Sequence, residues 1–282
     1  MWWLRPDFVF ARNYIAPCLT ARFGRVTVAE THAHPDNKTT PFLQMISAVT
    51  DYAKFKYLIT ISNVLSEHYQ SLGVPAEKIL VLPTGVDIDR FTRPGTLPTS
   101  PYSTEKPNIA YVGHLYDYKG IPTILETARH LPDFHFHLIG GTPQDIERHQ
   151  TFIAEQGIEN IILHGIQPQA TIPPFLWHAD ILLLPPSADH PSAQWTSPVK
   201  LGEYLASGTP VIATRIPALQ DWLSDEQVTF VEPDDATAMK NAIEGILNHP
   251  QEAQSRAKQG LELAQQFSYA NRARTILEKC GF

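Results

Sequence analysis

Short runs of β-branched and other apolar residues alternate with helical patterns along the chain, and this alternation restricts the possible fold more than any other feature. The helical patterns, such as Thr123–Leu131 and Ala236–Leu247, carry apolar residues at helical spacing. Some of the runs between them, including ILLLP and PVIAT, are apolar on both faces, as in strands that helices cover on both sides. The pattern predicts an α/β fold with parallel sheets. The predicted strands are Phe8–Ala11, Val26–Thr31, Tyr57–Ser62, Ile79–Pro83, Ile109–Gly113, His135–Gly140, Ile161–His164, Ile181–Pro185, Val211–Thr214 and Val228–Val231.

A segment without periodicity, Thr92–Pro107, divides the predicted strands into two groups. It is rich in Pro, Ser and Thr, which is typical of an interdomain linker, and a chain of 282 residues suits two domains. The first domain, residues 1–91, has four predicted strands, which is few for a doubly wound sheet, so we expect it to be incomplete. The second, residues 108–266, has six. Residues 251–280 predict two helices, and the last of them, in residues 267–282, is expected to pack back on the first domain.

The charge and cysteine content argue against several classes of protein. Lys and Arg number 22 against 29 Asp and Glu, for a net charge of −7 without a basic stripe, so nucleic acid is not the expected partner. Cys18 and Cys280 are too few for a zinc site or a disulfide framework, and a reducing cytoplasm is expected. No signal peptide is recognisable, and no run approaches the roughly 20 apolar residues of a membrane span. Trp2 and Trp3 leave open peripheral contact with a membrane or packing on the protein, and we favour packing.

The stretch GHLYDYKG, which follows the predicted strand Ile109–Gly113, is a candidate anion site. Ligands of open α/β sheets bind beyond the carboxyl ends of the strands. Gly113 allows a close approach of the backbone, and Lys119 would add a positive charge where a helix begins. The alternative is a tight turn with a solvated lysine. The stretch is not a P-loop, and no GxGxxG motif suggests a dehydrogenase.

The stretch SPVKLGEY, which follows the predicted strand Ile181–Pro185, adds a second candidate site. Pro198 suits the first turn of a helix, so the free N–H groups of Val199, Lys200 and Leu201 would point to the crevice. Glu203 lies one turn beyond Lys200 and can accept hydrogen bonds from the hydroxyls of a ribose. The alternative is a surface ion pair worth at most about 0.5 kcal/mol. Two neighbouring anion sites and a carboxylate favour a nucleoside diphosphate as the ligand.

Together these stretches give the chain a resemblance to the retaining glycosyltransferases of family 4, which have the GT-B fold with two Rossmann-like domains. The resemblance covers nearly the whole chain. The stretches that carry it are ARNYIAPCLTARFG, VTVAETHAHP, LITISNVLSEHYQSLGVPAEKILVLPTGVDIDRF, YVGHLYDYKGIPTILETA, HGIQPQATIPPFLWHADILLLP, SPVKLGEYLASGTPVIAT and FVEPDDATAMKNAI.

The resemblance implies roles for single residues around the donor. Lys119 and His114 take the positions that hold the donor diphosphate, although many members have arginine where this chain has His114. Glu203 corresponds to the second glutamate of the E-x7-E pattern, which holds the ribose. The first glutamate, which usually contacts the transferred sugar, is replaced by Trp195.

The resemblance implies further contacts with the donor. Ile166 stands where backbone groups meet the base, and the stretch from Ser197 through Pro198 to Leu201 contacts the donor. His32 matches a histidine of the first domain that faces the donor sugar, and His34 is a second candidate. His32 and Lys119 are the expected catalytic residues.

The resemblance implies a hexosyltransferase that moves a sugar from a nucleotide-sugar to an acceptor hydroxyl with retention of configuration. No metal or other cofactor is expected, because cations and helix ends neutralise the leaving diphosphate. The acceptor stays open between a lipid-linked sugar, a polysaccharide and a small metabolite. We expect a cytoplasmic protein, at the inner face of the membrane if the acceptor is lipid-linked.

Family members usually begin with three further strands and a glycine-rich loop, which this sequence lacks. A fragment, a late start codon and a reduced enzyme all stay open. The main alternative function is therefore a nucleotide-sugar-binding module without catalysis. A sugar-nucleotide epimerase would need more carboxylates than Glu30, Asp36 and Asp189 supply in the loops.

Overall fold

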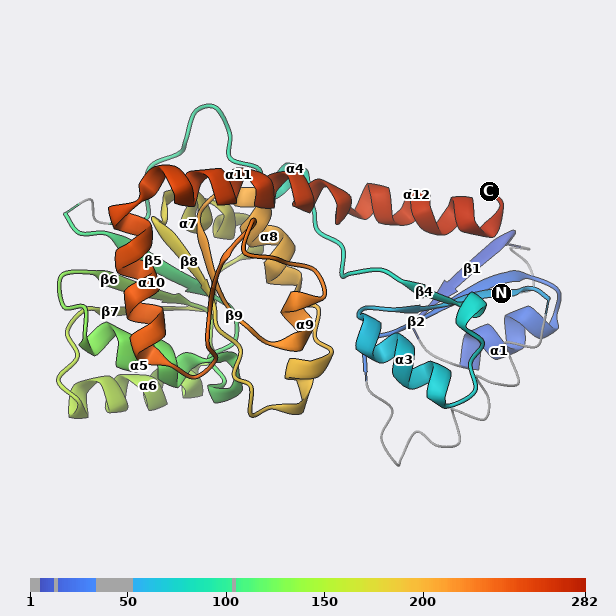
Figure 1. The fold of residues 1–282 in the computed structure, drawn as a ribbon, viewed down its shortest axis with the longest axis horizontal. Coiled ribbons are helices and arrows are strands. Elements are labelled where there is room, and N and C mark those ends of the chain that lie inside the picture. Colours follow the sequence, from blue (N-terminus) through green and yellow to red (C-terminus); the bar gives the residue numbers. More distant parts are fainter. Residues whose placement is uncertain (1–5, 13–14, 34–52, 103–104) are drawn as a thin grey trace. The chain divides into compact units, whose positions relative to one another are not determined.

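The contacts of the chain divide it into two compact units (Figure 1). The computed structural model describes residues 6–12, 15–33, 53–102 and 105–282. The first unit comprises the described residues up to Thr84 together with Gln194–Ser197 and Arg272–Phe282, and the second comprises Gly85–Ala193 and Pro198–Asn271.

The chain enters the second unit at Gly85, before the predicted linker Thr92–Pro107. The reason is a set of apolar anchors in a segment whose composition resembles a linker. Ile88 and Phe91 of helix α4 (Ile88–Phe91) are buried in the core of the second unit, and so is Tyr102. The Tyr102 hydroxyl also donates a hydrogen bond of 2.7 Å to the carbonyl oxygen of Phe175. The proline and serine residues around these anchors therefore belong to an irregular segment on the surface of one domain.

The first unit contains a parallel sheet with the order β1-β2-β3-β4 in its described part. Its strands are β1 (Phe8–Ala11), β2 (Val26–Thr31), β3 (Phe55–Thr60) and β4 (Ile79–Val81). Its other elements are α1 (Ile15–Arg22), α3 (Asn63–Ser71), the 3-10 helix η1 (Ala76–Lys78) and α12 (Tyr269–Cys280), which begins in the second unit.

Neighbouring residues of each central strand of this sheet face opposite ways. On one face, Ala29 of β2 and Leu58 of β3 pack against Tyr69 of α3. On the other face, Val28 and Ile59 pack against Ile276 and Cys280 of α12. Both faces of the sheet are therefore covered by helices, and one of these helices comes from the C-terminal end of the chain.

The second unit contains a six-stranded parallel sheet with the order β10-β9-β8-β5-β6-β7. Its strands are β5 (Asn108–Val112), β6 (His135–Ile139), β7 (Ile161–Gly165), β8 (Ile181–Leu184), β9 (Val211–Thr214) and β10 (Thr229–Val231). The chain order reverses between β5 and β8, and in doubly wound sheets this switch point is where ligands bind. The structure confirms all the predicted strands of both units within about two residues at their ends.

Helices cover both faces of the second sheet (Figure 1). In β8, Ile181 and Leu183 face one layer of helices, and Leu182 and Leu184 face the other. This confirms the prediction of strands that are apolar on both sides. The first layer contains α5 (Ile121–Arg129), α6 (Pro143–Glu155) and α10 (Ala236–Asn248). The second contains α7 (Ile172–His178), α8 (Val199–Ser207), α9 (Pro217–Gln220) and, through Ala264, α11 (Pro250–Gln266). Short 3-10 helices are η2 (Asp117–Lys119), η3 (Gln169–Thr171) and η4 (Pro191–Gln194).

Candidate functional site

The loops that follow β5 and β8 meet at the switch point of the second sheet. Gly113, with a φ of 147°, directly follows β5, and a Cβ atom there would overlap the ammonium group of Lys200 from α8. Gly120, with a φ of 82°, follows η2, and a Cβ atom there would overlap the carbonyl group of Pro185 after β8. Only glycine permits the close approach to the Pro185 backbone, and the positive φ at both positions favours glycine. The structure therefore brings the two candidate anion sites of the sequence together.

Two lysines place their ammonium groups against aromatic rings at this point. The Nζ atom of Lys200 lies 4.0 Å from the centre of the Tyr111 ring, and that of Lys119 lies 4.8 Å from the centre of the Tyr118 ring. Neither lysine forms a salt bridge with a described residue. Aromatic faces attract a cation without neutralising it, so the charge of both groups is available to an anion.

Burial weakens the protonation of both lysines, and at Lys200 the charge of Lys119 adds to the effect. Burial, reinforced by the charge of Lys119 and opposed by Glu203, lowers the pKa of Lys200 to about 7. Burial also lowers the pKa of Lys119. A bound anion would relieve the cost of keeping two cations together in a poorly hydrated site.

Glu203 lies on α8, one turn beyond Lys200. Burial raises the pKa of its carboxyl group, against the opposing charges of Lys200 and Arg90. The helix that carries both groups is fixed to β5, because the Val112 N–H donates a hydrogen bond of 2.7 Å to the Tyr204 hydroxyl. The carboxylate is thus held at the end of β5 with reduced hydration, and hydroxyl donors of a ligand would stabilise its charged form.

The N-terminal turn of α8 offers fewer donors than its sequence predicts. Pro198 caps the helix without a side-chain hydrogen bond, and Val199 is exposed. The N–H group of Leu201 already donates to the Pro198 carbonyl oxygen at 3.0 Å, and the Leu201 side chain is buried in the core. Ser197 belongs to the first unit, where its hydroxyl accepts a 3.0 Å hydrogen bond from the Thr84 N–H and its carbonyl oxygen accepts one from the Thr84 hydroxyl at 2.8 Å.

His114, the other predicted diphosphate residue, is exposed and begins a series of stacked rings. It stacks on Tyr116 with 5.0 Å between ring centres, and Tyr116 stacks on Tyr118 at 5.5 Å. Tyr118 in turn stacks on His190, from the loop after β8, at 4.2 Å. Sequence reasoning missed the two tyrosines, although aromatic residues at every second position of HLYDY signal stacking on one side of the chain. No comparable sequence pattern marks His190 as a stacking residue.

Ile166, the residue predicted to lie at the base, directly follows β7 and is 70% exposed. With Gly141, Gly165 and Pro143 it lines a hollow of about 460 Å³. Gly165 and Gly141 both have positive φ angles, so the backbone is turned sharply here and leaves room beside the strand ends. The hollow has the dimensions of a small-molecule subsite.

The predicted catalytic residue His32 lies in the first unit within a chain of charged groups. Arg12 donates a 3.0 Å hydrogen bond to Nδ1 of His32, so Nε2 carries the hydrogen and donates to the Glu30 carboxylate. Arg272 of α12 donates to the other Glu30 oxygen at 2.6 Å and to the Pro83 carbonyl oxygen at 2.9 Å. Burial alone would raise the pKa of Glu30, but the hydrogen bond from His32 and the charge of Arg272 lower it overall. His34, Asp36, Trp2 and Trp3 lie outside the described residues.

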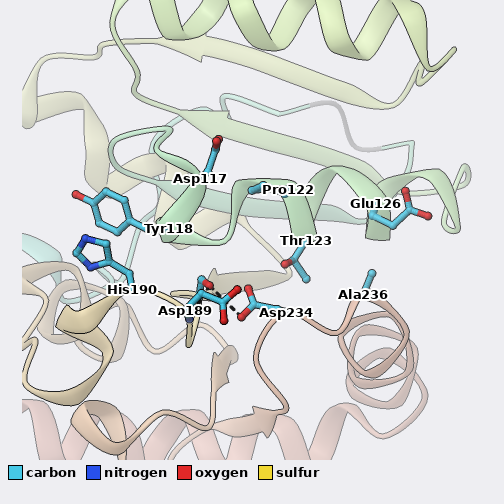
Figure 2. Close-up of a pocket in the computed structure, with 10 residues that line it drawn as sticks. Asp117, Tyr118, Pro122, Thr123, Glu126, Asp189, His190, Asp234 and Ala236 are labelled. Carbon is cyan, nitrogen blue, oxygen red and sulfur yellow. Dashed lines mark hydrogen bonds between the residues drawn. The ribbon is translucent and has the colours of Figure 1, made fainter.

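A pocket of about 550 Å³ opens between η2, the start of α5 and the loop after β8 (Figure 2). Tyr118 and His190 line it, and so does Asp234 from the loop before α10, which lies next to Asp189. Among the described residues, no group of three or more His, Cys, Asp or Glu side chains is arranged to hold a metal ion. In the same ranges, no helix has both the length and the apolar character that crossing a membrane requires.

Comparisons with known proteins agree with this architecture. The family model described as Glycosyl transferases group 1 matches residues 106–249, and the model described as Glycosyltransferase Family 4 matches residues 2–90. The putative colanic acid biosynthesis glycosyltransferase WcaL of Escherichia coli is 30% identical over 64% of this chain and 45% of its own length. The amylovoran biosynthesis glycosyltransferase AmsK of Erwinia amylovora is 28% identical over 67% of this chain and 46% of its own length. The chain thus spans less than half of these curated relatives.

Solved structures share the fold at low sequence identity. Anabaena Alr3699/HepE in complex with UDP superposes with a TM-score of 0.78 at 18% identity, over 96% of this chain and 78% of that one. A glycosyltransferase from Rickettsia africae superposes with a TM-score of 0.80 at 19% identity, over 99% of this chain and 77% of that one. These likenesses confirm the predicted α/β fold of the GT-B type.

Proposed function

The chain belongs to the group 1, family 4 glycosyltransferases, and we propose that it transfers a sugar from a nucleotide-sugar donor to an acceptor hydroxyl with retention of configuration. The observation that carries this proposal is the lysine pair at the switch point. Lys119 and Lys200 converge from the ends of two neighbouring strands, and neither has a salt-bridge partner among the described residues. Glu203 follows one helical turn later.

The arrangement supports a division of roles along the donor. The lysines would neutralise the two phosphates, and Glu203 would accept hydrogen bonds from the ribose hydroxyls. The hollow at Ile166 offers room for the base. Negative charge grows on the diphosphate as the glycosidic bond breaks, so cations that are already in place stabilise the transition state more than the bound donor. We propose that Lys119 and Lys200 supply this charge without a metal ion, and that His32 acts at the sugar.

UDP is the first nucleotide to test, because the structural neighbour Alr3699/HepE was solved with UDP and glucose. For the acceptor, relatives named for colanic acid and amylovoran biosynthesis support a polysaccharide precursor. The free, buried thiol of Cys280 fits a reducing compartment, and we propose a cytoplasmic location, at the membrane if the precursor is lipid-linked.

The test is a thermal-shift and calorimetry panel with UDP, GDP and ADP and their hexose conjugates, followed by a transfer assay with the nucleotides that bind. We expect one nucleotide series to bind, and binding to be lost when Lys200 is replaced by methionine. Failure of every nucleotide to bind the wild-type protein would overturn the proposal.

A nucleotide-sugar-binding module without transfer is the second candidate. It is favoured by one observation, that Lys119, Lys200 and Glu203 all lie in the second unit, together with the Tyr118 and Tyr111 rings against which the two lysines lie. Nucleotide binding without turnover, on any acceptor of the panel, would support this candidate over the enzyme.

A further inference from the structure

The loop after β8 is held against the rest of the second unit by hydrogen bonds that converge on two residues. The Ser187 N–H donates to the Tyr118 carbonyl oxygen at 3.0 Å. The Ser187 hydroxyl and the Ala188 N–H both donate to Oδ2 of Asp234, at 2.9 and 3.0 Å. One carboxylate oxygen therefore ties the loop to the corner between β10 and α10.

The backbone of Asp234 is strained, and local structure does not explain why an aspartate stands there. Its φ of 59° makes it the one non-glycine residue with a positive φ in the described ranges. Such a conformation costs on the order of 1 kcal/mol, which glycine would avoid. The neighbouring Asp235 already caps α10 by accepting from the Ala238 N–H at 2.8 Å. The hydrogen bonds that the Asp234 side chain makes go to the distant loop, which explains the aspartate.

The same loop supports the ring on which Lys119 lies. His190 of the loop stacks on Tyr118 with 4.2 Å between ring centres and 20° between the ring planes. The ammonium group of Lys119 lies 4.8 Å from the centre of that Tyr118 ring. A shift of the loop would move His190 and, through the stack, the Tyr118 ring. The ammonium group of Lys119, which lies over that ring, would move as well.

The pocket of about 550 Å³ explains why the position of the loop depends on the two hydrogen bonds of Asp234 (Figure 2). It lies between the loop, the start of α5 and the start of α10, and Ser187, Asp189 and His190 line it from the loop side. On this side the loop borders open space, so apolar packing does not fix it. The loop is held by the hydrogen bonds of Asp234, the bond from the Ser187 N–H to Tyr118 and the stack of His190 on Tyr118, and at its start the Thr214 hydroxyl donates to the Pro186 carbonyl oxygen at 2.8 Å.

We infer that Asp234 is a positioning residue, which holds the loop after β8 so that Tyr118 and His190 keep Lys119 aligned on the donor diphosphate. This inference rests on the proposed function for its effect on turnover. Its structural part, the fixation of the loop by one carboxylate, is independent of that function and can be measured without a donor.

The experiment compares Asp234→Gly, Asp234→Asn and Asp189→Asn with the wild-type chain. Glycine removes the acceptor and also relieves the strained backbone, whereas asparagine keeps an acceptor and tolerates the same φ. Asp189→Asn is the matched control, because it neutralises an exposed carboxylate of the same loop and pocket. The readouts are amide hydrogen exchange of residues 187–190, thermal unfolding, and kcat and KM for the donor.

In Asp234→Gly we expect exchange of residues 187–190 to accelerate about tenfold, as loss of one hydrogen-bonding carboxylate implies. The unfolding temperature should not fall, and kcat should drop about tenfold with little change in KM, because Lys119 acts on charge that develops in the transition state. Asp234→Asn should stay within about threefold of wild type in exchange and turnover, and Asp189→Asn should match wild type.

Unchanged exchange in Asp234→Gly would overturn the inference, and so would an Asp234→Asn variant as impaired as Asp234→Gly. Accelerated exchange with unchanged kcat would overturn the link to Lys119. A wild-type protein that binds no nucleotide would overturn the proposed function alone, because the exchange result still decides whether Asp234 fixes the loop.

Discussion

The two units each hold a cluster of charged residues, and the clusters are built in opposite ways. In the first unit, Arg272 and His32 both bind the buried carboxylate of Glu30, so each charge has a partner. In the second, Lys119 and Lys200 lie against aromatic rings, and neither has a salt bridge among the described residues. Paired charges stabilise the fold because each buried charge has a partner of opposite sign. Two unpaired cations repel each other, and an anionic ligand would relieve that repulsion.

The largest expected effect is on the paired cluster. Arg272→Met removes the ion pair of the Glu30 side chain, which is 6% exposed, with a permanently charged partner. We expect a loss of about 3–5 kcal/mol in the stability of the first unit. Amide exchange of β2 and β3 in urea measures it. Arg215→Met, followed by amide exchange of β9 and β10 in its own unit, is the control, because the ion pair of Arg215 with Asp225 is exposed and should contribute less than about 1 kcal/mol. Equal effects of the two changes would mean that the cluster is not a structural support.

Lys119→Ala should reduce turnover more than binding. Its ammonium group favours the charge that grows on the leaving diphosphate, so we expect kcat to fall about 10²- to 10³-fold, with a smaller change in KM. Steady-state kinetics with the donor identified by the panel measure the two constants. A change confined to KM would make Lys119 a binding residue only.

Glu203→Gln should weaken nucleotide binding by about 1.5–3 kcal/mol, because the amide keeps an acceptor but loses the charge that strengthens hydrogen bonds to hydroxyls. Calorimetric titration with the nucleotide measures the loss. The same nucleotide without its 2′-hydroxyl group is the control, and it should bind both forms about equally. Unchanged affinity would remove Glu203 from the site.

Binding of the nucleotide should weaken as the pH rises above about 7, because burial and the charge of Lys119 hold the pKa of Lys200 near that value. A bound diphosphate favours protonated Lys200, so its pKa rises on binding and the complex takes up a proton. Affinity should therefore fall by up to about tenfold per pH unit above 7, where phosphate groups are already ionised. Titrations at pH 7.5 and 8.5, in buffers of different ionisation enthalpy, measure the proton uptake. The same affinity at both pH values, without proton uptake, would contradict the low pKa.

Much of the fold could be predicted from the sequence, because apolar periodicity marks strands and helices locally. The unit boundary could not, since Phe91 and Tyr102 stand in a segment with the composition of a linker and their burial depends on distant partners. Within the site, the sequence does predict that Lys200 and Glu203 lie one turn apart on the same helix. The overlap with the Pro185 backbone that makes Gly120 obligatory and the hydrogen bonds of Asp234 connect loops far apart in the sequence, so no local pattern predicts them.

Two residues to which the sequence assigns donor contacts already make hydrogen bonds within the protein. The hydroxyl of Ser197 accepts a hydrogen bond from Thr84, and the N–H group of Leu201 is bonded within its own turn. A motif marks which residues lie near a site, but the hydrogen bonds that each residue already makes decide what it can still offer to a ligand. Lys119, Lys200 and Glu203 therefore remain the strongest candidates for donor binding.

The central claim is that the second unit keeps its two cations unpaired for a diphosphate, and Lys200→Met tests it most directly. Methionine has a similar length and suits an apolar surrounding, so the repulsion with Lys119 disappears while the packing on Tyr111 is kept. Thermal unfolding and calorimetric titration with UDP are measured on the wild-type and variant proteins. We expect the variant to unfold at a higher temperature and to lose UDP binding, as is typical where function opposes stability. A variant that unfolds at a lower temperature and binds UDP as tightly as wild type would contradict it.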